Sequence, residues 1–130
     1  MSINIEGIHH IAIIASNIEV SKAFYLDVLG CTVIQETYRP DRDSWKVDLA
    51  LNNTYIIELF SFPDSPPRVN QPEACGLRHL AFSVSDIKQT TRQLKRKNIP
   101  FDELKKDPLS NKYYTFIKDP DGLPIEFYQI

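Results

Sequence analysis

Two nine-residue stretches of this chain, HIAIIASNI (His10–Ile18) and HLAFSVSDI (His79–Ile87), carry the same residue at four matching places. The shared residues are a histidine, an alanine, a serine and an isoleucine, all offset by 69 positions. Later in each half comes an aliphatic–Glu–apolar triplet, Ile57–Leu59 and Ile125–Phe127, with an offset of 68. Self-similarity at a fixed distance indicates an internal repeat. The chain of 130 residues is therefore predicted to hold two copies of one module.

Each half is predicted to have the same order of elements. An apolar run of strand length comes first. A capping pair follows, Ser16-Asn17 or Ser85-Asp86, and opens a helix. The predicted strands are 8–15, 31–38, 45–51 and 54–61 in the first half, and 77–84, 99–104, 113–118 and 124–129 in the second. The predicted fold class is α+β: two βαβββ modules at about 6–62 and 77–130, joined by a proline-rich linker at 63–76.

Spacing within the predicted helices suggests which side chains face the sheets. In the first helix, apolar residues at helical spacing are Val20, Ala23, Phe24 and Val28, and Gly30 follows the last turn. In the second, the corresponding residues are Ile87, Thr91 and Leu94, followed by Asn98. Two tight turns are expected, at Asn52-Asn53 and at Asp119–Gly122.

Alternation along the strands decides which side chains share a face of the sheet. It places His10 and His79 on the face opposite the more apolar side chains. Glu58 and Glu126, each between apolar neighbours, fall on the same side as the histidines. His9 falls on the other face and has no counterpart in the repeat.

These four polar residues fit a site for a divalent metal. A buried carboxylate costs free energy unless it is paired or binds a cation. Taken singly, a histidine or glutamate in a strand is more often an ordinary structural or solvated residue. The recurrence of the same types at equivalent places favours a two-histidine, two-glutamate site made of His10, Glu58, His79 and Glu126.

Composition narrows the class of protein. The content of 42% hydrophobic and 25% charged residues is typical of a soluble globular domain. The net charge of -2 does not favour a nucleic-acid binder. No apolar run approaches the ~20 residues needed to span a bilayer. The first residues, 1–6, do not have the pattern of a signal peptide, and two cysteines make no disulfide framework. We therefore expect a cytoplasmic protein without membrane contact.

The paired modules, the two strand histidines and the ending Asp-Pro-Asp-Gly-x-x-Ile-Glu (119–126) resemble the vicinal oxygen chelate superfamily. This superfamily includes glyoxalase I, extradiol dioxygenases, methylmalonyl-CoA epimerase, fosfomycin-resistance enzymes and bleomycin-binding proteins. The resemblance covers nearly the whole chain and is strongest to a glyoxalase-like group of small bacterial proteins, at Arg42–Leu51, Ile57–Pro63 and Gly76–Val84. It implies a curved sheet around a metal site.

The resemblance to glyoxalase I also implies roles for the site residues. His10, Glu58, His79 and Glu126 would be the metal ligands, for Ni²⁺, Zn²⁺, Co²⁺ or Mn²⁺. The implied reaction is a lactoylglutathione lyase-like conversion of a small oxygenated substrate of the hemithioacetal type, by proton abstraction and stabilisation of an enediolate. Glu126 is the better candidate for the base, and Glu58 could share the role.

Two other classes of function stay open at this point. One is a different metalloenzyme of the superfamily: an epimerase, a dioxygenase or a thiol transferase. The other is a small-molecule-binding or resistance protein, although the complete set of four ligands argues against it.

Substrate recognition and assembly are less determined by the sequence. A basic and aromatic cluster, made of Arg39, Arg42, Trp45 and Lys46, is a candidate cradle for an anionic substrate. Its alternative is a solvated loop neutralised by neighbouring aspartates. The resemblance implies a homodimer, with the site either inside one chain or shared between two chains that exchange modules.

Overall fold

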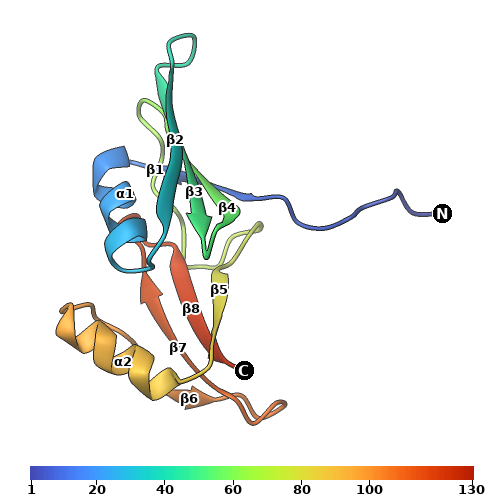
Figure 1. The fold of residues 1–130 in the computed structure, drawn as a ribbon, viewed down its shortest axis with the longest axis vertical. Helices are drawn as coiled ribbons and strands as arrows, with labels where there is room; N and C mark the ends of the chain where they lie inside the picture. The colour runs from blue at the N-terminus through green and yellow to red at the C-terminus, as the bar shows by residue number, and fades with distance from the viewer. The chain divides into compact units, whose positions relative to one another are not determined.

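A computed structural model describes residues 1–130. The chain divides into two compact units, Met1–Pro66 and Pro67–Ile130. Each unit has one four-stranded sheet and one α-helix of ten residues (Figure 1). The two units share a common plan, which is described for each in turn.

The first unit has the order strand, helix and three strands. Its elements are β1 (Ile11–Ala15), α1 (Ile18–Asp27), β2 (Thr32–Arg39), β3 (Ser44–Leu51) and β4 (Thr54–Ser61). The strand order in the sheet is β1-β4-β3-β2. Strand β1 runs parallel to β4, and the other neighbours are antiparallel.

The second unit repeats this plan. Its elements are β5 (Leu80–Val84), α2 (Ile87–Arg96), β6 (Lys105–Lys106), β7 (Tyr113–Lys118) and β8 (Pro124–Gln129). The strand order is β5-β8-β7-β6, again with one parallel pair, β5 and β8. The prediction of two βαβββ modules is confirmed, and neither sheet closes into a barrel.

Both helices begin at the predicted caps. The side chain of Asn17 accepts hydrogen bonds from the backbone N–H groups of Glu19 and Val20, and Asp86 accepts one from Gln89. These bonds satisfy N–H groups that have no partner inside the helix.

The predicted turns are also present. Asn52 and Asn53 have φ of 51° and 63°, the conformation of a tight hairpin turn that asparagine tolerates. In the last turn, the Asp119 carboxylate accepts from the backbone N–H groups of Asp121 and Leu123, and Gly122 has φ of 86°. A side chain at Gly122 would be strained in that conformation.

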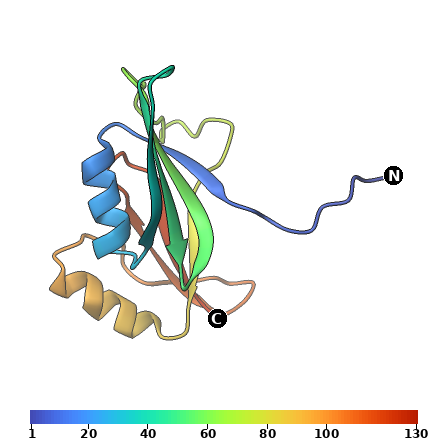
Figure 2. The same ribbon diagram turned by 45° about the horizontal axis from the view of Figure 1, so that its top comes forward.

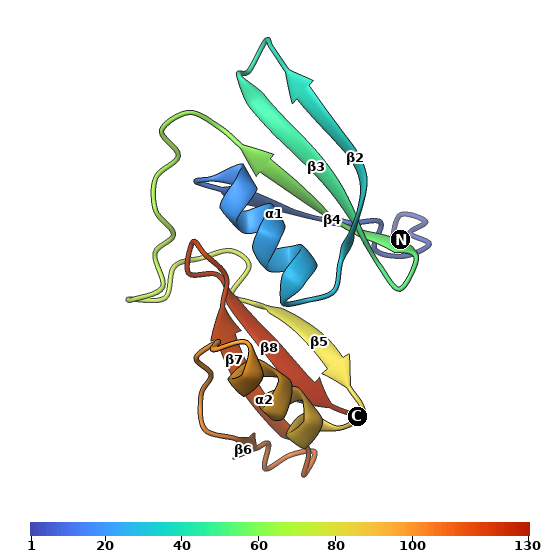
Figure 3. The ribbon, with the colours of Figure 1, turned by 60° about the vertical axis from the view of Figure 1, so that its left-hand side comes forward.

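Each helix covers one face of its own sheet (Figure 3). Helix α1 packs against β4, and α2 packs against β8. The sheet faces beneath them are apolar and buried. In the first unit the buried sheet residues include Ile13, Ala15, Val47, Leu49, Ile57 and Leu59, and in the second Ile117, Ile125 and Phe127. The opposite face of each sheet carries one of the two repeated glutamates, Glu58 or Glu126.

The predicted inner face of the first helix is wrong. Ser21 and Tyr25 are its buried residues, whereas Val20 is 51% exposed and Ala23 is exposed. Ser21 and Tyr25 are four positions apart and so share a helix face. A tyrosine can supply more buried area than a valine, and this decides the rotation of the helix. The prediction for α2 is confirmed at Ile87 and Leu94.

The strand predicted at 99–104 is also wrong, because pairing in this region is limited to the two-residue β6. Pro100 has no N–H to donate to a neighbouring strand. Instead, two hydrogen bonds of the Asp102 backbone hold this segment against β7. The Asp102 N–H donates to the Phe116 carbonyl, and the Asp102 carbonyl accepts from the Thr115 hydroxyl.

Residues 1–10 precede β1 and are exposed, and they lead away from the sheet of the first unit (Figure 2). No helix in the structure has the length and apolar character needed to cross a membrane.

Candidate functional site

The two glutamates singled out by the repeat occupy equivalent places in the two sheets. Glu58 of β4 lies opposite Ala12 of β1, and Glu126 of β8 lies opposite Ala81 of β5. Directly opposite residues share a face of the sheet. Because alanine is small, the matched alanines leave space beside each carboxylate on the face away from the helix.

Each glutamate is joined by the histidine of its own half. His10 Nε2 lies 3.4 Å from Glu58 Oε1, and His79 Nε2 lies 3.4 Å from Glu126 Oε1. This separation is longer than the ~2.7–2.9 Å of a charge-assisted hydrogen bond. It equals the distance of about 3.4 Å between two ligands bound at ~2.1 Å in a tetrahedral arrangement. The two pairs therefore fit a divalent cation in chemistry and in spacing.

Neither half of the chain gathers three or more His, Cys, Asp or Glu side chains into a group that could hold a metal. The candidate metal ligands in each half are one imidazole and one carboxylate, 3.4 Å apart.

Glu58 is surrounded by polar groups. The Tyr55 hydroxyl donates to Glu58 Oε2 and lies 3.1 Å from Asp48 Oδ1. Lys46 Nζ lies 3.2 Å from Asp48 Oδ1 and 3.6 Å from Glu58 Oε2. Glu58 and Asp48 are only 9% and 7% exposed, and they are directly opposite each other in β4 and β3. One ammonium group thus faces two buried carboxylates, which leaves a net negative charge beside His10.

The hydroxyl of Tyr55 remains protonated in this setting. Burial raises the pKa of Tyr55 above its usual range, and the hydrogen bonds to Glu58 and Asp48 raise it further. Tyr55 is therefore a hydrogen-bond donor toward the carboxylates.

The prediction that His9 faces away from the site is wrong. His9 Nδ1 and His10 Nδ1 are 2.8 Å apart, so one ring nitrogen donates to the other, and the His9 ring centroid lies 5.3 Å from that of Tyr55. Both histidines precede β1, so strand pairing does not impose alternation there. His9 contacts the Nδ1 atom of His10, which leaves Nε2 of His10 directed to Glu58.

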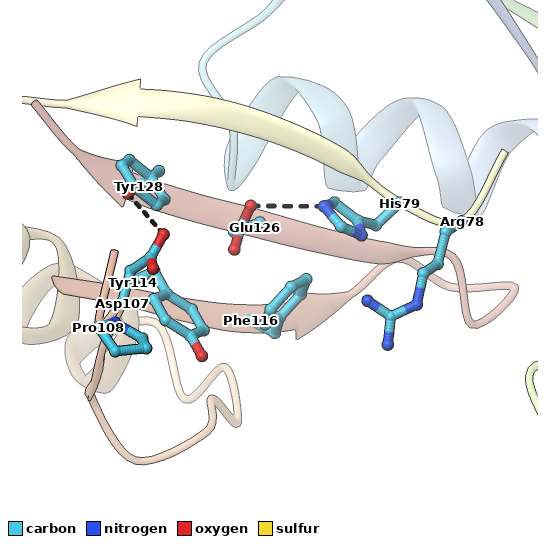
Figure 4. A pocket seen from close by; sticks show the side chains of 8 residues that line it. All are labelled: Arg78, His79, Asp107, Pro108, Tyr114, Phe116, Glu126 and Tyr128. Carbon is cyan, nitrogen blue, oxygen red and sulfur yellow. Dashed lines mark hydrogen bonds and ion pairs between the residues drawn. The ribbon is translucent and has the colours of Figure 1, made fainter. Parts of the chain in front are cut away.

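The corresponding face of the second unit is aromatic instead of charged. Phe116 lies opposite Glu126, and Tyr114 lies opposite Tyr128 with the two rings stacked. A pocket of about 280 Å³ opens beside Glu126 (Figure 4). Its lining residues are Arg78, His79, Asp107, Pro108, Tyr114, Phe116, Glu126 and Tyr128.

Two details of this pocket concern its polar atoms. The Nδ1 atom of His79 is buried and has no hydrogen-bond partner, which is uncommon for a buried polar atom. At the rim, the backbone N–H of Leu109 and the Tyr128 hydroxyl donate to Asp107, and both hydrogen bonds lower the pKa of Asp107. Asp107 thereby ties the segment after β6 to β8.

The structure brings together three of the four residues of the predicted substrate cradle. The guanidinium groups of Arg39 and Arg42 lie over the Phe62 ring, at 5.6 Å and 4.8 Å from its centroid. Lys46 is opposite Phe60, on the face that carries Glu58. Trp45 lies on the other face, where its ring contacts Tyr38.

The sequence analysis missed Tyr55 and the contact of His9, and it counted Asp48 only among the aspartates that neutralise the basic cluster, not as a neighbour of Glu58. The signal for Asp48 was present, because it stands between apolar neighbours in a strand, as Glu58 does. Strict alternation places Tyr55 and Glu58, three residues apart, on opposite faces of β4. The proximity of Tyr55 to Glu58 was therefore not predictable, because the register between β3 and β4 shifts at Leu49/Ala50.

Two βαβββ modules with a histidine–glutamate pair on each sheet define a protein of the glyoxalase-like class. The chain belongs to the Glyoxalase/Bleomycin resistance protein/Dioxygenase superfamily, whose family model matches residues 7–127. It is 55% identical over 127 residues to the uncharacterized protein YaeR of Escherichia coli, covering 98% of each chain.

A solved structure and a more distant relative agree with this assignment. A glyoxalase family protein from Enterococcus faecalis matches with a TM-score of 0.88 and 41% identity, over 95% of this chain and 97% of the other. Human mitochondrial methylmalonyl-CoA epimerase is 29% identical over 132 residues, covering 97% of this chain and 75% of that protein.

Proposed function

We propose that this protein is a divalent-metal-dependent enzyme of the glyoxalase type, acting as a lyase or isomerase on a small oxygenated substrate such as a hemithioacetal. The observation that carries the proposal is the repeated histidine–glutamate pair, with the same 3.4 Å separation and the same register in both halves. A single such pair would be unremarkable, but two equivalent pairs supply two imidazoles and two carboxylates. This donor set suits Ni²⁺, Zn²⁺, Co²⁺ or Mn²⁺.

The proposed ligands are His10, Glu58, His79 and Glu126, all four on one ion. When bound, a divalent ion stabilises the negative charge that develops on neighbouring substrate oxygens. Glu126 is proposed as the base that takes the proton α to the substrate carbonyl and returns it to the adjacent carbon. It lines the pocket of about 280 Å³, which offers the substrate room beside the carboxylate. Glu58 is the alternative base.

Arg39 and Arg42 are proposed to bind an anionic group of the substrate. Arg39 Nε is buried and has no hydrogen-bond partner, so an oxyanion would satisfy it. We expect Arg39→Ala to raise KM by about tenfold or more, because a hydrogen bond to a charged group contributes ~1.5–3 kcal/mol, with little change in kcat. Arg92→Ala, on the exposed part of α2, is the control. An unchanged KM in Arg39→Ala would remove Arg39 from the substrate site.

The reaction is tested by metal analysis followed by a substrate screen. The protein is loaded with Ni²⁺ or Zn²⁺ and offered hemithioacetals of methylglyoxal with several thiols. Turnover by the wild type, lost in His79→Ala and Glu126→Gln, is the expected result. A metal-loaded protein that turns over none of these hemithioacetals refutes the glyoxalase-type reaction.

A second candidate is an epimerase, favoured by the 29% identity to methylmalonyl-CoA epimerase over nearly the whole of this chain. The same site would serve, because epimerisation also removes and returns a proton α to a carbonyl. Exchange of that proton with deuterated solvent, measured with methylmalonyl-CoA, distinguishes this activity from lyase turnover. A dioxygenase or a thiol transferase is not supported by any particular feature of the site.

A small-molecule-binding protein is the alternative outside enzymology. It would be favoured if the isolated protein bound no divalent ion and if Glu58→Gln and His79→Ala left the binding of a small ligand unchanged. We further propose that the protein forms a homodimer, and a monomeric mass measured by sedimentation equilibrium would contradict this proposal.

A further inference from the structure

The two halves of the chain differ in what surrounds their otherwise equivalent glutamates. The offset of 68 residues that relates Glu58 to Glu126 also relates Asp48 to Phe116 and Lys46 to Tyr114. The same offset places Leu123 where the first half has Tyr55. The two halves therefore share the histidine–glutamate pair. The three neighbours of Glu58, namely Lys46, Asp48 and Tyr55, have different residue types at the corresponding positions around Glu126.

Glu58 is held by a hydrogen bond at Oε2, the carboxylate oxygen that does not face His10. Its Oε1 atom is the one near His10 Nε2, and its Oε2 atom accepts from Tyr55 and lies near Lys46. With this oxygen held by a hydrogen bond, the carboxylate cannot rotate without breaking that buried hydrogen bond, and an unsatisfied buried polar group is destabilising.

Tyr55 is itself oriented by Asp48. A phenol has a single proton, and here it faces two carboxylate oxygens. Lys46 Nζ lies 3.2 Å from Asp48 Oδ1, so the ammonium group can satisfy Asp48 while the phenol donates to Glu58. The four side chains form one connected network on the face of the first sheet away from α1.

Glu126 has no such support in its own half. His79 is its polar partner there, and the residue opposite it is Phe116, which has no hydrogen-bonding side chain. The carboxylate faces the pocket shown in Figure 4.

We propose that Tyr55 is a positioning residue: it fixes Glu58 so that this glutamate presents Oε1 to the metal, and nothing plays that part for Glu126. The proposal rests on the metal site of the proposed function. It assigns Tyr55 no contact with the substrate. Its effect passes through Glu58, with Asp48 and Lys46 holding the hydrogen-bond arrangement.

The test uses Co²⁺ binding by the full chain, measured by competition titration and by the visible absorption of the bound ion. Tyr55→Phe is expected to weaken Co²⁺ binding about tenfold, the lower end of the effect of removing a hydrogen bond behind a metal ligand, and to change the Co²⁺ spectrum. Tyr38→Phe is the matched control, because it also removes a tyrosine hydrogen bond to a carboxylate, Asp43, on the opposite face of the same sheet. It is expected to change neither quantity.

A double-mutant comparison separates positioning from a general loss of structure. In a Glu58→Gln background, Tyr55→Phe should change Co²⁺ affinity less than about twofold, because its effect requires the carboxylate. In a Glu126→Gln background the full loss of about tenfold should remain. Urea unfolding of the metal-free proteins checks that the variants fold. If Tyr55→Phe does not fold, Tyr55→Met replaces it, because the flexible methionine side chain can fill the space of the tyrosine ring without donating a hydrogen bond.

The outcomes are distinct from those that test the proposed function. Co²⁺ binding that is unchanged in Tyr55→Phe, or equally coupled to both glutamates, overturns the positioning role alone. Absence of turnover with the coupling intact refutes the enzyme reaction and leaves the positioning role standing. A wild type that binds no divalent ion refutes the metal site and the positioning role together.

Discussion

The assignment of the two faces of β4 leads to a sharp prediction about stability. Ile57 and Glu58 are neighbours in this strand and point to opposite sides, so the position of the candidate site depends on Ile57 being in the core. Ile57 is fully buried, whereas Ile14 of β1 is 55% exposed on the face that carries Glu58. The same substitution at the two isoleucines should therefore have very different effects.

Replacing isoleucine with alanine removes three carbon atoms. At ~0.8 kcal/mol for each buried carbon, the lost transfer free energy at Ile57 is about 2.4 kcal/mol. A cavity in the tightly packed layer under α1 adds to this, so Ile57→Ala should lower the free energy of unfolding by about 3–4 kcal/mol. Ile14→Ala should cost less than about 1 kcal/mol, since the side chain is already largely in water.

The measurement is urea unfolding followed by tryptophan fluorescence. The only tryptophan, Trp45, lies in the neighbouring strand β3, so its emission reports on this sheet. Comparable losses at Ile14 and Ile57, or a loss below about 1 kcal/mol at Ile57, would contradict the assignment of the two faces and would remove Glu58 from the proposed site.

Three further predictions concern assembly, the thiols and pH. Mixing His10→Ala with His79→Ala protein should restore metal binding if the site is shared between two chains, and unchanged metal content in the mixture would exclude sharing. A thiol reagent at pH 8 should modify exposed Cys75 first and buried Cys31 only on unfolding, because burial raises the pKa of Cys31; mass spectrometry of the labelled peptides decides the order. The pKa of Asp107 is lowered in the folded protein, so its stabilising contribution is present above the ordinary carboxyl value of ~4 and is lost as the pH falls through the lower folded value. Asp107→Asn should therefore flatten the fall in stability across that acidic range, and an identical acid-unfolding profile would contradict the hydrogen-bond assignment.

Local physical rules account for much of the fold. The caps at Asn17 and Asp86 were predictable because their side chains bond to N–H groups two or three residues away. The hairpin at Asn52-Asn53 was predictable because few residues accept a positive φ. The rotation of α1 was not, because the burial of Tyr25 depends on the shape of the sheet beneath it.

The candidate site also contains residues that the sequence predicts and residues that only the structure identifies. His10 and Glu58 could be singled out from the sequence because the same residue types recur in the second half as His79 and Glu126. The approach of Tyr55 to Glu58 was not predictable, because a shift in register between β3 and β4 lies beside it. The orientation of His9 was predicted wrongly for a related reason. His9 lies before Ile11, the first paired residue of β1, and an unpaired segment need not follow the two-residue alternation of a strand.

The sequence by itself determined the two modules, their capped helices and the four repeated side chains, since each depends on near neighbours or on a pattern that alternation preserves. The tertiary structure decided which groups surround each glutamate. Charged and tyrosine side chains converge on Glu58, and aromatic rings line the face around Glu126. These partners come from other strands or lie across a register shift, and only the pairing of the strands, with its shifts, specifies which of them meet.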